Sequence, residues 1–519
     1  MKIFLGLLLI IWGFSQAQQD GSSARPMFQD ITQDMFRSDP ESNPVQLNYG
    51  IAVSDVDDDG QMEVIVAGYN GPNLVLKYDI LTKELVNIAI DDPSSPYYNL
   101  RDEEGNAIGV CACDVDGDGR EEIYFLNTNQ AYSGMATYSD KLFKFRDGKY
   151  VDILSDSINS NIASYFAGRS VACVDRTGNG KYAIYLANYA RGSVGPHSLI
   201  EMDESSSDIS KGIIALRNVA EDAGVSKLTG GRGVTVGPIV SKDGLSDIFC
   251  DNEHGPNFLF KNNGDGTFTD IASEAGVADS RQHGRGVMLT DFNGDGDIDI
   301  VYGNWNGPHR IYLQTNDTQG RPKFRDIATD AFAKPSPIRT VIAADFDNDG
   351  NLEVLMNNIA YRGRAPNRLF QVLPGSNGED PTITELNIGD ALEPTGLGTG
   401  GAVTDLDSDG KLEVILAHGE SAEQPLTIYK LNPNEDFQHG WLRVHVLTAQ
   451  GAPARGAKVT LYSSSRKQAR VIDAGSGYLC QMEPVAHFGL GDELPLRQAK
   501  YISYNFFLSK NIVFGQVSA

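Results

Sequence analysis

Short apolar segments alternate with acidic turns along most of the chain. Apolar runs such as YGIAVS at 49–54, IGVCAC at 108–113 and RGVMLT at 285–290 each end at such a turn. A β-branched or aromatic run follows the turn, and a third run, such as NLVLKY at 73–78, begins after a proline. Units then close with an aromatic-x-Asp-Ile phrase, as in FRDI at 324–327. These patterns predict four short β-strands per unit, because turn residues separate runs of strand-forming residues.

The unit recurs seven times, at intervals of roughly 50 to 65 residues. We therefore predict an all-β fold, a seven-bladed β-propeller over residues 28–431, in which radial repetition leaves only short strand edges. Residues 28–31 (FQDI) copy the closing phrase but precede the first unit, and the seventh unit, which ends near Leu431, lacks one. We expect this N-terminal strand to pair with residues 426–431 and to complete the last blade.

Five of the acidic turns share one arrangement of oxygen-bearing side chains. Asp or Asn stands at position 3, Asp at positions 1 and 5, Gly at position 6 and an acid at position 9. Hard carboxylate oxygens and a backbone carbonyl at position 7 are ligands that Ca²⁺ prefers, and Gly permits the tight turn. The sequence therefore predicts about five structural Ca²⁺ ions. The expected ligands are Asp55, Asp57, Asp59, Gln61 and Glu63; Asp114, Asp116, Asp118, Arg120 and Glu122; Asp291, Asn293, Asp295, Asp297 and Asp299; Asp345, Asp347, Asp349, Asn351 and Glu353; and Asp405, Asp407, Asp409, Lys411 and Glu413.

Two other interpretations of these turns are less favourable. An EF-hand needs flanking helices and a bidentate Glu at position 12, where this chain has apolar or aromatic residues such as Val66 and Tyr302. Paired catalytic carboxylates need one acid with a raised pKa in one pocket, whereas five similar clusters lie in different blades. The two weaker copies, at Asp175 and around Ile239, carry too few charges, and we expect them to bind no calcium.

The ends and the composition indicate the compartment. Residues 1–17 have a basic start, a short apolar run and a small-x-small site, and they read as a secretory signal peptide cleaved after Ala17. No later segment is apolar over the length that spans a bilayer. The formal net charge of −26 argues against nucleic acid or anionic membranes as partners. We expect a secreted protein, glycosylated at the sequon of Asn316.

The five cysteines are odd in number and lack the spacing of a zinc site. Disulfides are permitted outside the cell, but at least one thiol stays free or pairs with another chain. The cysteines are Cys111, Cys113, Cys173, Cys250 and Cys480. For Cys111, Cys173 and Cys250, the plain interpretation is a buried strand cysteine.

The C-terminal part shows a different alternation. Residues 441–492 alternate in a way that predicts a small β-domain, preceded by a linker at 432–440 and followed by a divergent tail at 493–519. The acidic turns resemble the FG-GAP repeats of integrin α-subunit heads. The C-terminal phrases HGWLRVHV, GAKV, GSGY and HFGLG resemble an ASPIC/UnbV domain, and this order resembles the cartilage acidic protein 1 family.

That resemblance implies a secreted, acidic, calcium-binding glycoprotein of extracellular matrix and nervous tissue without established enzymatic activity. It implies receptor binding and axon guidance as roles, and an extracellular protein or receptor as partner. The tail matches neither the further strands nor the EGF-like module of longer members, so it resembles a truncated or alternatively spliced end.

A glycine stretch, two histidines and a set of arginines are further candidates for ligand binding. The stretch GLGTGG at 396–401 fits a dinucleotide fingerprint, but no helix pattern follows it. His254 and His309 flank equivalent proline turns and are either surface residues or part of a transition-metal or ligand site. A ring of arginines before successive units either receives an anionic ligand or pairs with neighbouring acids; its members are Arg169, Arg232, Arg285 and Arg339. The leading hypothesis is a non-enzymatic protein-interaction scaffold. The alternatives are a propeller enzyme with a pocket at the centre of the disc and a passive matrix component.

Overall fold

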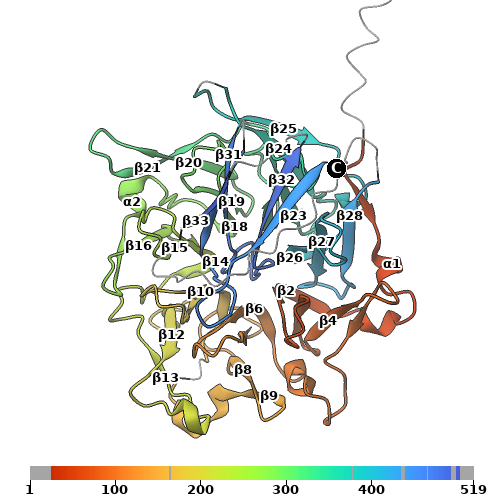
Figure 1. Cartoon of the computed structure of the whole chain (residues 1–519), viewed down its shortest axis with the longest axis vertical. Coiled ribbons are helices and arrows are strands. Elements are labelled where there is room, and N and C mark those ends of the chain that lie inside the picture. Colours follow the sequence, from red (N-terminus) through yellow and green to blue (C-terminus); the bar gives the residue numbers. More distant parts are fainter. Residues whose placement is uncertain are drawn as a thin grey trace, which may run out of the picture.

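Seven four-stranded antiparallel sheets surround a central axis and form a seven-bladed β-propeller (Figure 1). The computed structural model describes residues 25–162, 165–376, 378–433, 439–463 and 466–491, and the backbone of 498–502. The predicted fold class is thereby confirmed. The predicted signal peptide lies outside the described residues, as do most of the linker at 432–440 and most of the tail.

The blades follow one another in chain order, and the first strand of each lies nearest the axis. Blade 1 contains β2 (Leu47–Ser54), β3 (Glu63–Tyr69), β4 (Leu74–Asp79) and β5 (Glu84–Asn87). Blade 2 contains β6 (Ala107–Cys113), β7 (Glu122–Asn127), β8 (Lys141–Arg146) and β9 (Lys149–Asp152). Blade 3 contains β10 (Gly168–Val174), β11 (Ala183–Asn188), β12 (Ser198–Met202) and β13 (Leu216–Asn218). Blade 4 contains β14 (Gly230–Gly237), β15 (Asp247–Glu253), β16 (Phe258–Asn262) and β17 (Phe268–Asp270). Blade 5 contains β18 (Gly284–Thr290), β19 (Asp299–Asn304), β20 (Arg310–Asn316) and β21 (Pro322–Asp326). Blade 6 contains β22 (Ile338–Ala344), β23 (Leu352–Asn358), β24 (Arg368–Leu373) and β25 (Thr382–Leu386). Blade 7 contains β26 (Gly398–Thr404), β27 (Glu413–His418), β28 (Thr427–Leu431) and β1 (Phe28–Asp30).

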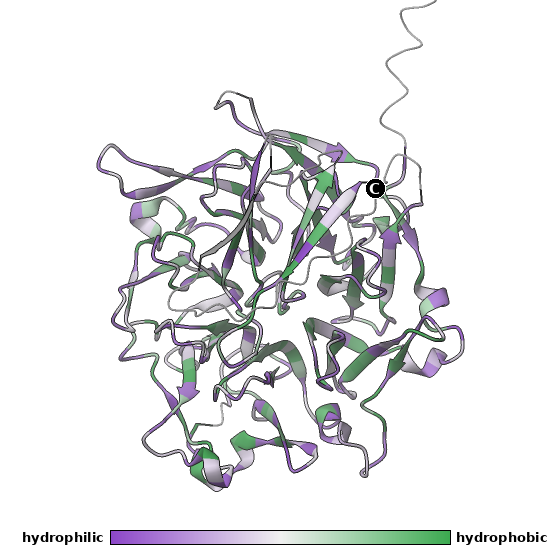
Figure 2. Cartoon of the chain, in the orientation of Figure 1, coloured by the Kyte–Doolittle hydropathy of each residue, from purple (hydrophilic) through white to green (hydrophobic). Residues whose placement is uncertain are grey.

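Helical segments are short and peripheral. They are α1 (Thr32–Met35), α2 (Ala272–Ala275) and the 3-10 turns at Pro40–Ser42, Tyr98–Arg101, Ile153–Ser155, Ser157–Asn159, Ile209–Lys211 and Asp390–Leu392. The inner two strands of a blade, such as β6 and β7, are buried along their whole length. Adjacent blades cover both of their faces, which explains why these strands read as continuous apolar runs. Hydrophilic residues gather in the peripheral loops (Figure 2).

The N-terminal strand closes the ring, as the sequence predicts. Strand β1 pairs antiparallel with β28, and Phe28, Gln29 and Asp30 lie opposite Leu431, Lys430 and Tyr429. The last blade therefore combines the two ends of the propeller. This pairing is confirmed, and it joins segments about 400 residues apart without any covalent link.

A buried ionic contact supports the closing blade. Glu393 accepts hydrogen bonds from His418 Nε2 at 3.0 Å, from the Thr427 hydroxyl and from the Tyr429 hydroxyl. Burial alone would raise the pKa of Glu393, but His418 and the two hydroxyls lower it to about 2. Burial alone would lower the pKa of His418, but Glu393 raises it above its ordinary value of 6.5.

We expect this contact to make stability depend on pH in two windows. Glu393 has a depressed folded-state pKa, so its contribution is present above the ordinary value of 4.5 and is lost as pH falls towards about 2. His418 has a raised folded-state pKa, so its contribution is present below 6.5 and is lost as pH rises through that raised value. Urea unfolding at a series of pH values should reveal both losses, and Glu393→Gln should remove both. Equal pH profiles for the variant and the wild type would refute the assignment.

The C-terminal segment forms two small sheets beside the propeller. Strand β29 (Gly440–His445) pairs with β32 (Val485–Gly491), and β30 (Lys458–Tyr462) lies between β31 (Lys467–Val471) and β33 (Gln498–Ile502). A core of its own includes Leu442, Val459 and Phe488. The connection between β31 and β32 leaves this core, and its Tyr478, Leu479 and Cys480 pack among propeller residues instead.

That connection, residues 472–484, fills the centre of the propeller, and we call it the central loop. Its hydrogen bonds reach the innermost strand of every blade. The partners are Val53 and Ile51 in blade 1, Val110 in blade 2, Cys173 in blade 3, Arg232 in blade 4, Val287 in blade 5, Thr340 in blade 6 and Gly401 in blade 7. The C-terminal segment is thus both a small β-unit and the central packing element of the disc.

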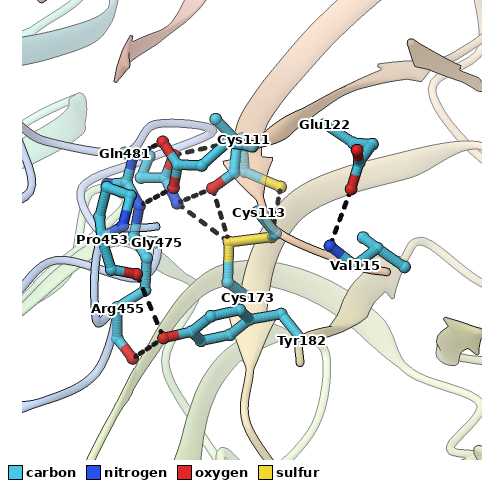
Figure 3. Close-up of a disulfide and its surroundings, with 12 residues drawn as sticks. Cys111, Cys113, Val115, Glu122, Cys173, Tyr182, Pro453, Arg455, Gly475 and Gln481 are labelled. Carbon is cyan, nitrogen blue, oxygen red and sulfur yellow. Dashed lines mark hydrogen bonds and ion pairs between the residues drawn. A yellow bond between two sulfur atoms is a disulfide. The ribbon is translucent and has the colours of Figure 1, made fainter. Parts of the chain in front are cut away.

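One disulfide joins two blades. Cys113 of β6 and Cys173 of β10 are bonded (Figure 3). Cys111, Cys250 and Cys480 are buried free thiols. The expectation of a buried strand cysteine is confirmed for Cys111, Cys173 and Cys250. Cys173 is in addition disulfide-bonded, because β6 and β10 are neighbours whose side chains meet between the blades.

Candidate metal centres

The five predicted calcium turns lie on one face of the disc. Each joins the first strand of a blade to the second, in blades 1, 2, 5, 6 and 7. Since successive blades repeat the same connection, all five turns point to the same side. The structure brings side chains from positions 1, 3 and 9 together: the ligand oxygens of Asp55, Asp57 and Glu63 lie within 4.8 Å of one another. The equivalent residues do the same in blade 2, with Asp114, Asp116 and Glu122, and in blade 6, with Asp345, Asp347 and Glu353.

Recurring hydrogen bonds shape each turn and explain the acids at positions 5 and 9. One oxygen of the position 9 acid accepts the N–H of position 2; the pairs are Glu63 with Val56, Glu122 with Val115, Asp299 with Phe292, Glu353 with Phe346 and Glu413 with Leu406. The position 5 carboxylate accepts the N–H of position 7; the pairs are Asp59 with Gln61, Asp118 with Arg120, Asp295 with Asp297, Asp349 with Asn351 and Asp409 with Lys411. These bonds leave the second oxygen of the position 9 acid to face the other acids of its turn, except in blade 5, where Gln314 donates its N–H to Asp299 Oδ1.

Several of the gathered oxygens are buried without a hydrogen-bond donor. They are Asp57 Oδ1, Glu63 Oε1, Asp116 Oδ1, Asp345 Oδ1 and Asp405 Oδ1. Burial raises the pKa of Glu63 to about 8, of Asp114 to about 7, and of Asp291 and Asp405 to about 6. Burying such acids unpaired is costly. A divalent cation held by oxygen ligands would satisfy these atoms, so the residues present fit Ca²⁺.

Three of the turns also receive a lysine that sequence reasoning missed. Lys144 Nζ lies 3.0 Å from Asp116, 2.7 Å from Asp118 and 2.8 Å from Glu122. Lys77 and Lys430 approach the turns of blades 1 and 7 in the same way. The signal was present in the third strand, because each lysine stands opposite the position 9 acid across the strand pair. The corresponding residue is the neutral Gln371 in blade 6, where the acids have no ammonium partner on that strand.

The C-terminal segment covers the turns of blades 5, 6 and 7. Gly489 donates its N–H to Asp345 Oδ2 at 2.9 Å. Lys467 Nζ donates to the Asp295 carbonyl oxygen at 2.5 Å, and Arg443 contacts Asp405. These contacts place the small β-unit over the acidic face, which the sequence pattern did not reveal.

The two weak copies differ from the five full turns. The backbone N–H groups of Gly178, Asn179 and Gly180 satisfy the Asp175 carboxylate. In blade 4, Ser241 and two other backbone N–H groups satisfy the oxygens of Asp247. Asp114 of a full turn accepts the same three backbone N–H bonds, so the turn at Asp175 is distinguished by Thr177 and Ala183, which stand where the full turns have oxygen ligands at positions 3 and 9. The expectation that they bind no calcium stays a prediction.

The arginine ring lies around the central loop and not around an open channel. The coulombic attraction of Arg232, Arg169, Arg285 and Arg339 lowers the pKa of Tyr478 even though burial alone would raise it. Arg232 and Arg285 pair with Glu253, and Arg339 pairs with Glu420. Ion pairing with neighbouring acids is observed for Arg232, Arg285 and Arg339, whereas Arg169 lies over the Tyr132 ring. The hypothetical enzyme pocket at the disc centre is occupied by Tyr478.

The other residues singled out from the sequence lie at separate places in the fold. His309 is buried and bonds to the Asn304 N–H and the Ser336 hydroxyl, whereas the His254 ring lies 4.9 Å from that of His283. The two predicted histidines therefore do not form one site. Ligand atoms of Glu253, His254 and His283 lie within 4.8 Å of one another, and a transition-metal or ligand site at His254 stays a prediction. The glycine stretch at 396–401 leads into β26, as expected for a strand. Asn316 is exposed at the end of β20, and its glycosylation stays a prediction. In the described residues, no helix is long and apolar enough to cross a membrane.

Comparison with known proteins identifies the relatives of this chain. The FG-GAP-like repeat family matches residues 240–302 and 291–356, and the ASPIC and UnbV family matches residues 448–498. Among solved structures, the BP39L lectin from Burkholderia pseudomallei has a TM-score of 0.44 at 12% identity, covering 74% of this chain and 96% of that chain. A fungal alcohol oxidase in complex with copper has a TM-score of 0.45 at 10% identity, covering 89% and 98%.

Curated relatives match far more closely. Cartilage acidic protein 1 of Homo sapiens is 60% identical over 100% of this chain and 78% of that protein. The proteins of the same name from Mus musculus and Xenopus tropicalis are 65% and 63% identical, over 90% and 91% of this chain and 72% of each relative. The chain belongs to the cartilage acidic protein 1 family.

Proposed function

We propose that the chain is a secreted, calcium-binding protein of the extracellular matrix or of neuronal surfaces that acts as a non-enzymatic scaffold for other proteins. The buried, donorless carboxylate oxygens in the acidic turns carry this proposal. Calcium would neutralise them and fix each connection between the first and second strands of a blade. Such a rigid disc presents its loops in constant positions, which favours binding of an extracellular protein or receptor because little ordering is needed on association.

The turns with a lysine would bind calcium by releasing the ammonium group. Lysine carries its charge on a long flexible stem, so Lys77, Lys144 and Lys430 can turn towards solvent when an ion enters. The ammonium competes with the ion for the same carboxylates. We therefore expect the turns of blades 1, 2 and 7 to bind calcium more weakly than the turn of blade 6.

A calcium titration tests the proposal directly. Isothermal titration of the calcium-free protein should reveal about five ions per chain, in at least two affinity classes. Asp345→Ala should remove one ion of the tighter class, because Asp345 supplies the first ligand of the blade 6 turn. Asp175→Ala is the matched control and should leave the number of ions unchanged, since that turn has Thr177 and Ala183 in place of the ligands at positions 3 and 9. A protein that binds no calcium at millimolar concentration would contradict the proposal.

A further inference from the structure

A cationic cavity opens on the face of the disc opposite the acidic turns. It has a volume of about 970 Å³ and lies between blades 5 and 6. The loops that form it join β19 to β20, β21 to β22 and β23 to β24, with Glu385 and Leu392 completing the wall. The acidic turns lie at the other ends of β19 and β23, so the two features face opposite sides. Cavities of this size are typical of small-molecule and saccharide sites.

The charge of the cavity is opposite to that of the protein. Its lining includes Lys334, Arg362, Arg364 and Arg368, against the single carboxylate of Glu385. Glu385 is paired with Arg368 at 2.8 Å. Lys334, Arg362 and Arg364 are exposed, and none of them forms an ion pair with any described residue. The cavity therefore holds three positively charged side chains without an acidic partner among the described residues, in a chain whose net charge is −26.

Two of the cations stand on the loop between β23 and β24, and Lys334 stands on the loop between β21 and β22. The connection from β23 to β24 spans residues 359–367, whereas the corresponding connection in blade 5 spans only 305–309. The extra residues include Arg362 and Arg364. Trp305 and Tyr361, whose ring centroids lie 5.7 Å apart, supply flat walls beside them. The Tyr361 hydroxyl accepts a hydrogen bond from Arg339 at 3.1 Å, and Arg339 lies over the Trp305 ring, so the walls are held by the arginine ring.

We propose that this cavity binds an acidic saccharide, one that carries sulfate or carboxylate groups. Guanidinium groups offer paired donors that match sulfate and carboxylate oxygens. Aromatic walls pack against the C–H faces of sugar rings through dispersion contacts. A peptide fits less well, because turns supply most of the lining and Glu385 is the one lining residue on an edge strand, β25, which leaves little strand edge for β-augmentation. This inference goes beyond the proposed scaffold role and rests on residues outside the calcium turns.

Direct binding measurements test the inference. The full chain in 2 mM calcium and physiological salt is titrated with a heparin-derived hexasaccharide, with neutral chitohexaose and with a hexaglutamate peptide. We expect the sulfated hexasaccharide to bind at least tenfold more tightly than the other two, with an affinity that falls as salt rises. Absence of binding at millimolar hexasaccharide would overturn the inference. Equal or tighter binding of hexaglutamate would overturn it in favour of an acidic peptide.

Two double variants locate the site. Arg362→Ala with Arg364→Ala should weaken hexasaccharide binding at least tenfold. The matched control is Lys149→Ala with Arg191→Ala, which removes the same charge from exposed positions; Arg191 stands in the corresponding connection of blade 3, at 189–197. We expect the control to change binding less than twofold. Equal losses in both variants would mean that general charge and not this cavity attracts the saccharide. Because calcium is titrated separately, failure here leaves the calcium proposal untouched.

Discussion

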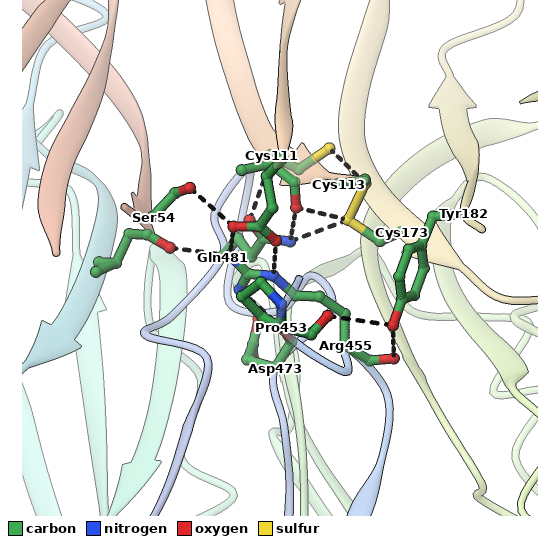
Figure 4. A network of polar contacts seen from close by, with 12 residues as sticks. Ser54, Cys111, Cys113, Cys173, Tyr182, Pro453, Arg455, Asp473 and Gln481 are labelled. Carbon is green, nitrogen blue, oxygen red and sulfur yellow. Dashed lines mark hydrogen bonds and ion pairs between the residues drawn. A yellow bond between two sulfur atoms is a disulfide. The ribbon is translucent and has the colours of Figure 1, made fainter. Parts of the chain in front are cut away.

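Replacing Arg455 by Ala should lower the free energy of unfolding by about 3–5 kcal/mol, the cost of breaking a buried ion pair. Arg455 and Glu121 have side-chain exposures of 0% and 4%, and their Nε–Oε1 distance is 2.7 Å. A second guanidinium nitrogen, Nη2, lies 3.0 Å from Glu121 Oε2 and also donates to the Val53 carbonyl oxygen. Arg455 thereby joins the C-terminal segment to blades 1 and 2 (Figure 4). Urea unfolding measures the change.

The same arginine also organises its own segment. Its Nη1 donates to the carbonyl oxygens of Asp473 and Met482, which bracket the central loop. Truncation would therefore leave Glu121 buried without its charge partner and would free both ends of the loop. Arg217→Ala is the control: that side chain is 53% exposed beside Glu201, and its loss should cost no more than about 1 kcal/mol. Similar unfolding curves for the two variants would show that the C-terminal segment does not clamp the disc.

Removal of calcium should lower the unfolding temperature by about ten degrees or more. Each ion that binds only the folded state adds about 4 kcal/mol when its concentration exceeds the dissociation constant a thousandfold. One kcal/mol corresponds to about 2–4 °C in a chain of 150–250 residues and to less in a larger one. Several ions acting together therefore outweigh any single substitution. Differential scanning calorimetry in 2 mM calcium and in EDTA measures the shift.

Variants separate this effect from general electrostatics. Asp345→Ala should reduce the difference between calcium and EDTA, because one ion is lost, whereas Asp175→Ala should leave it as in the wild type. Added Mg²⁺ should restore little of the lost stability, since Mg²⁺ demands a smaller octahedral site than a flexible carboxylate turn provides. An unfolding temperature that is unchanged by EDTA would refute a structural role for calcium.

Much of the architecture follows from the sequence pattern, and for an identifiable physical reason. The repeat supplies seven similar units, and each unit contains its own strand signals and its own acidic turn. The closing phrase at residues 28–31 was out of phase with the first unit, which predicted its pairing with β28. Oxygen ligands at positions 1, 3 and 9 cluster because a tight turn brings neighbours in sequence together. All of these features are local or follow from counting units.

The remaining features depend on residues far apart in sequence, and no local pattern encodes them. Tyr478 meets arginines from four blades, Lys144 enters a turn from a strand about 25 residues away, and Cys113 bonds to Cys173 only because blades 2 and 3 are adjacent. The cationic cavity likewise exists only where loops of two blades meet. The repeats, the ring closure and the acidic turns can be predicted from the amino-acid pattern, because they arise from short-range periodicity. What fills the centre of the disc cannot, since it depends on how seven separate strands converge on one segment.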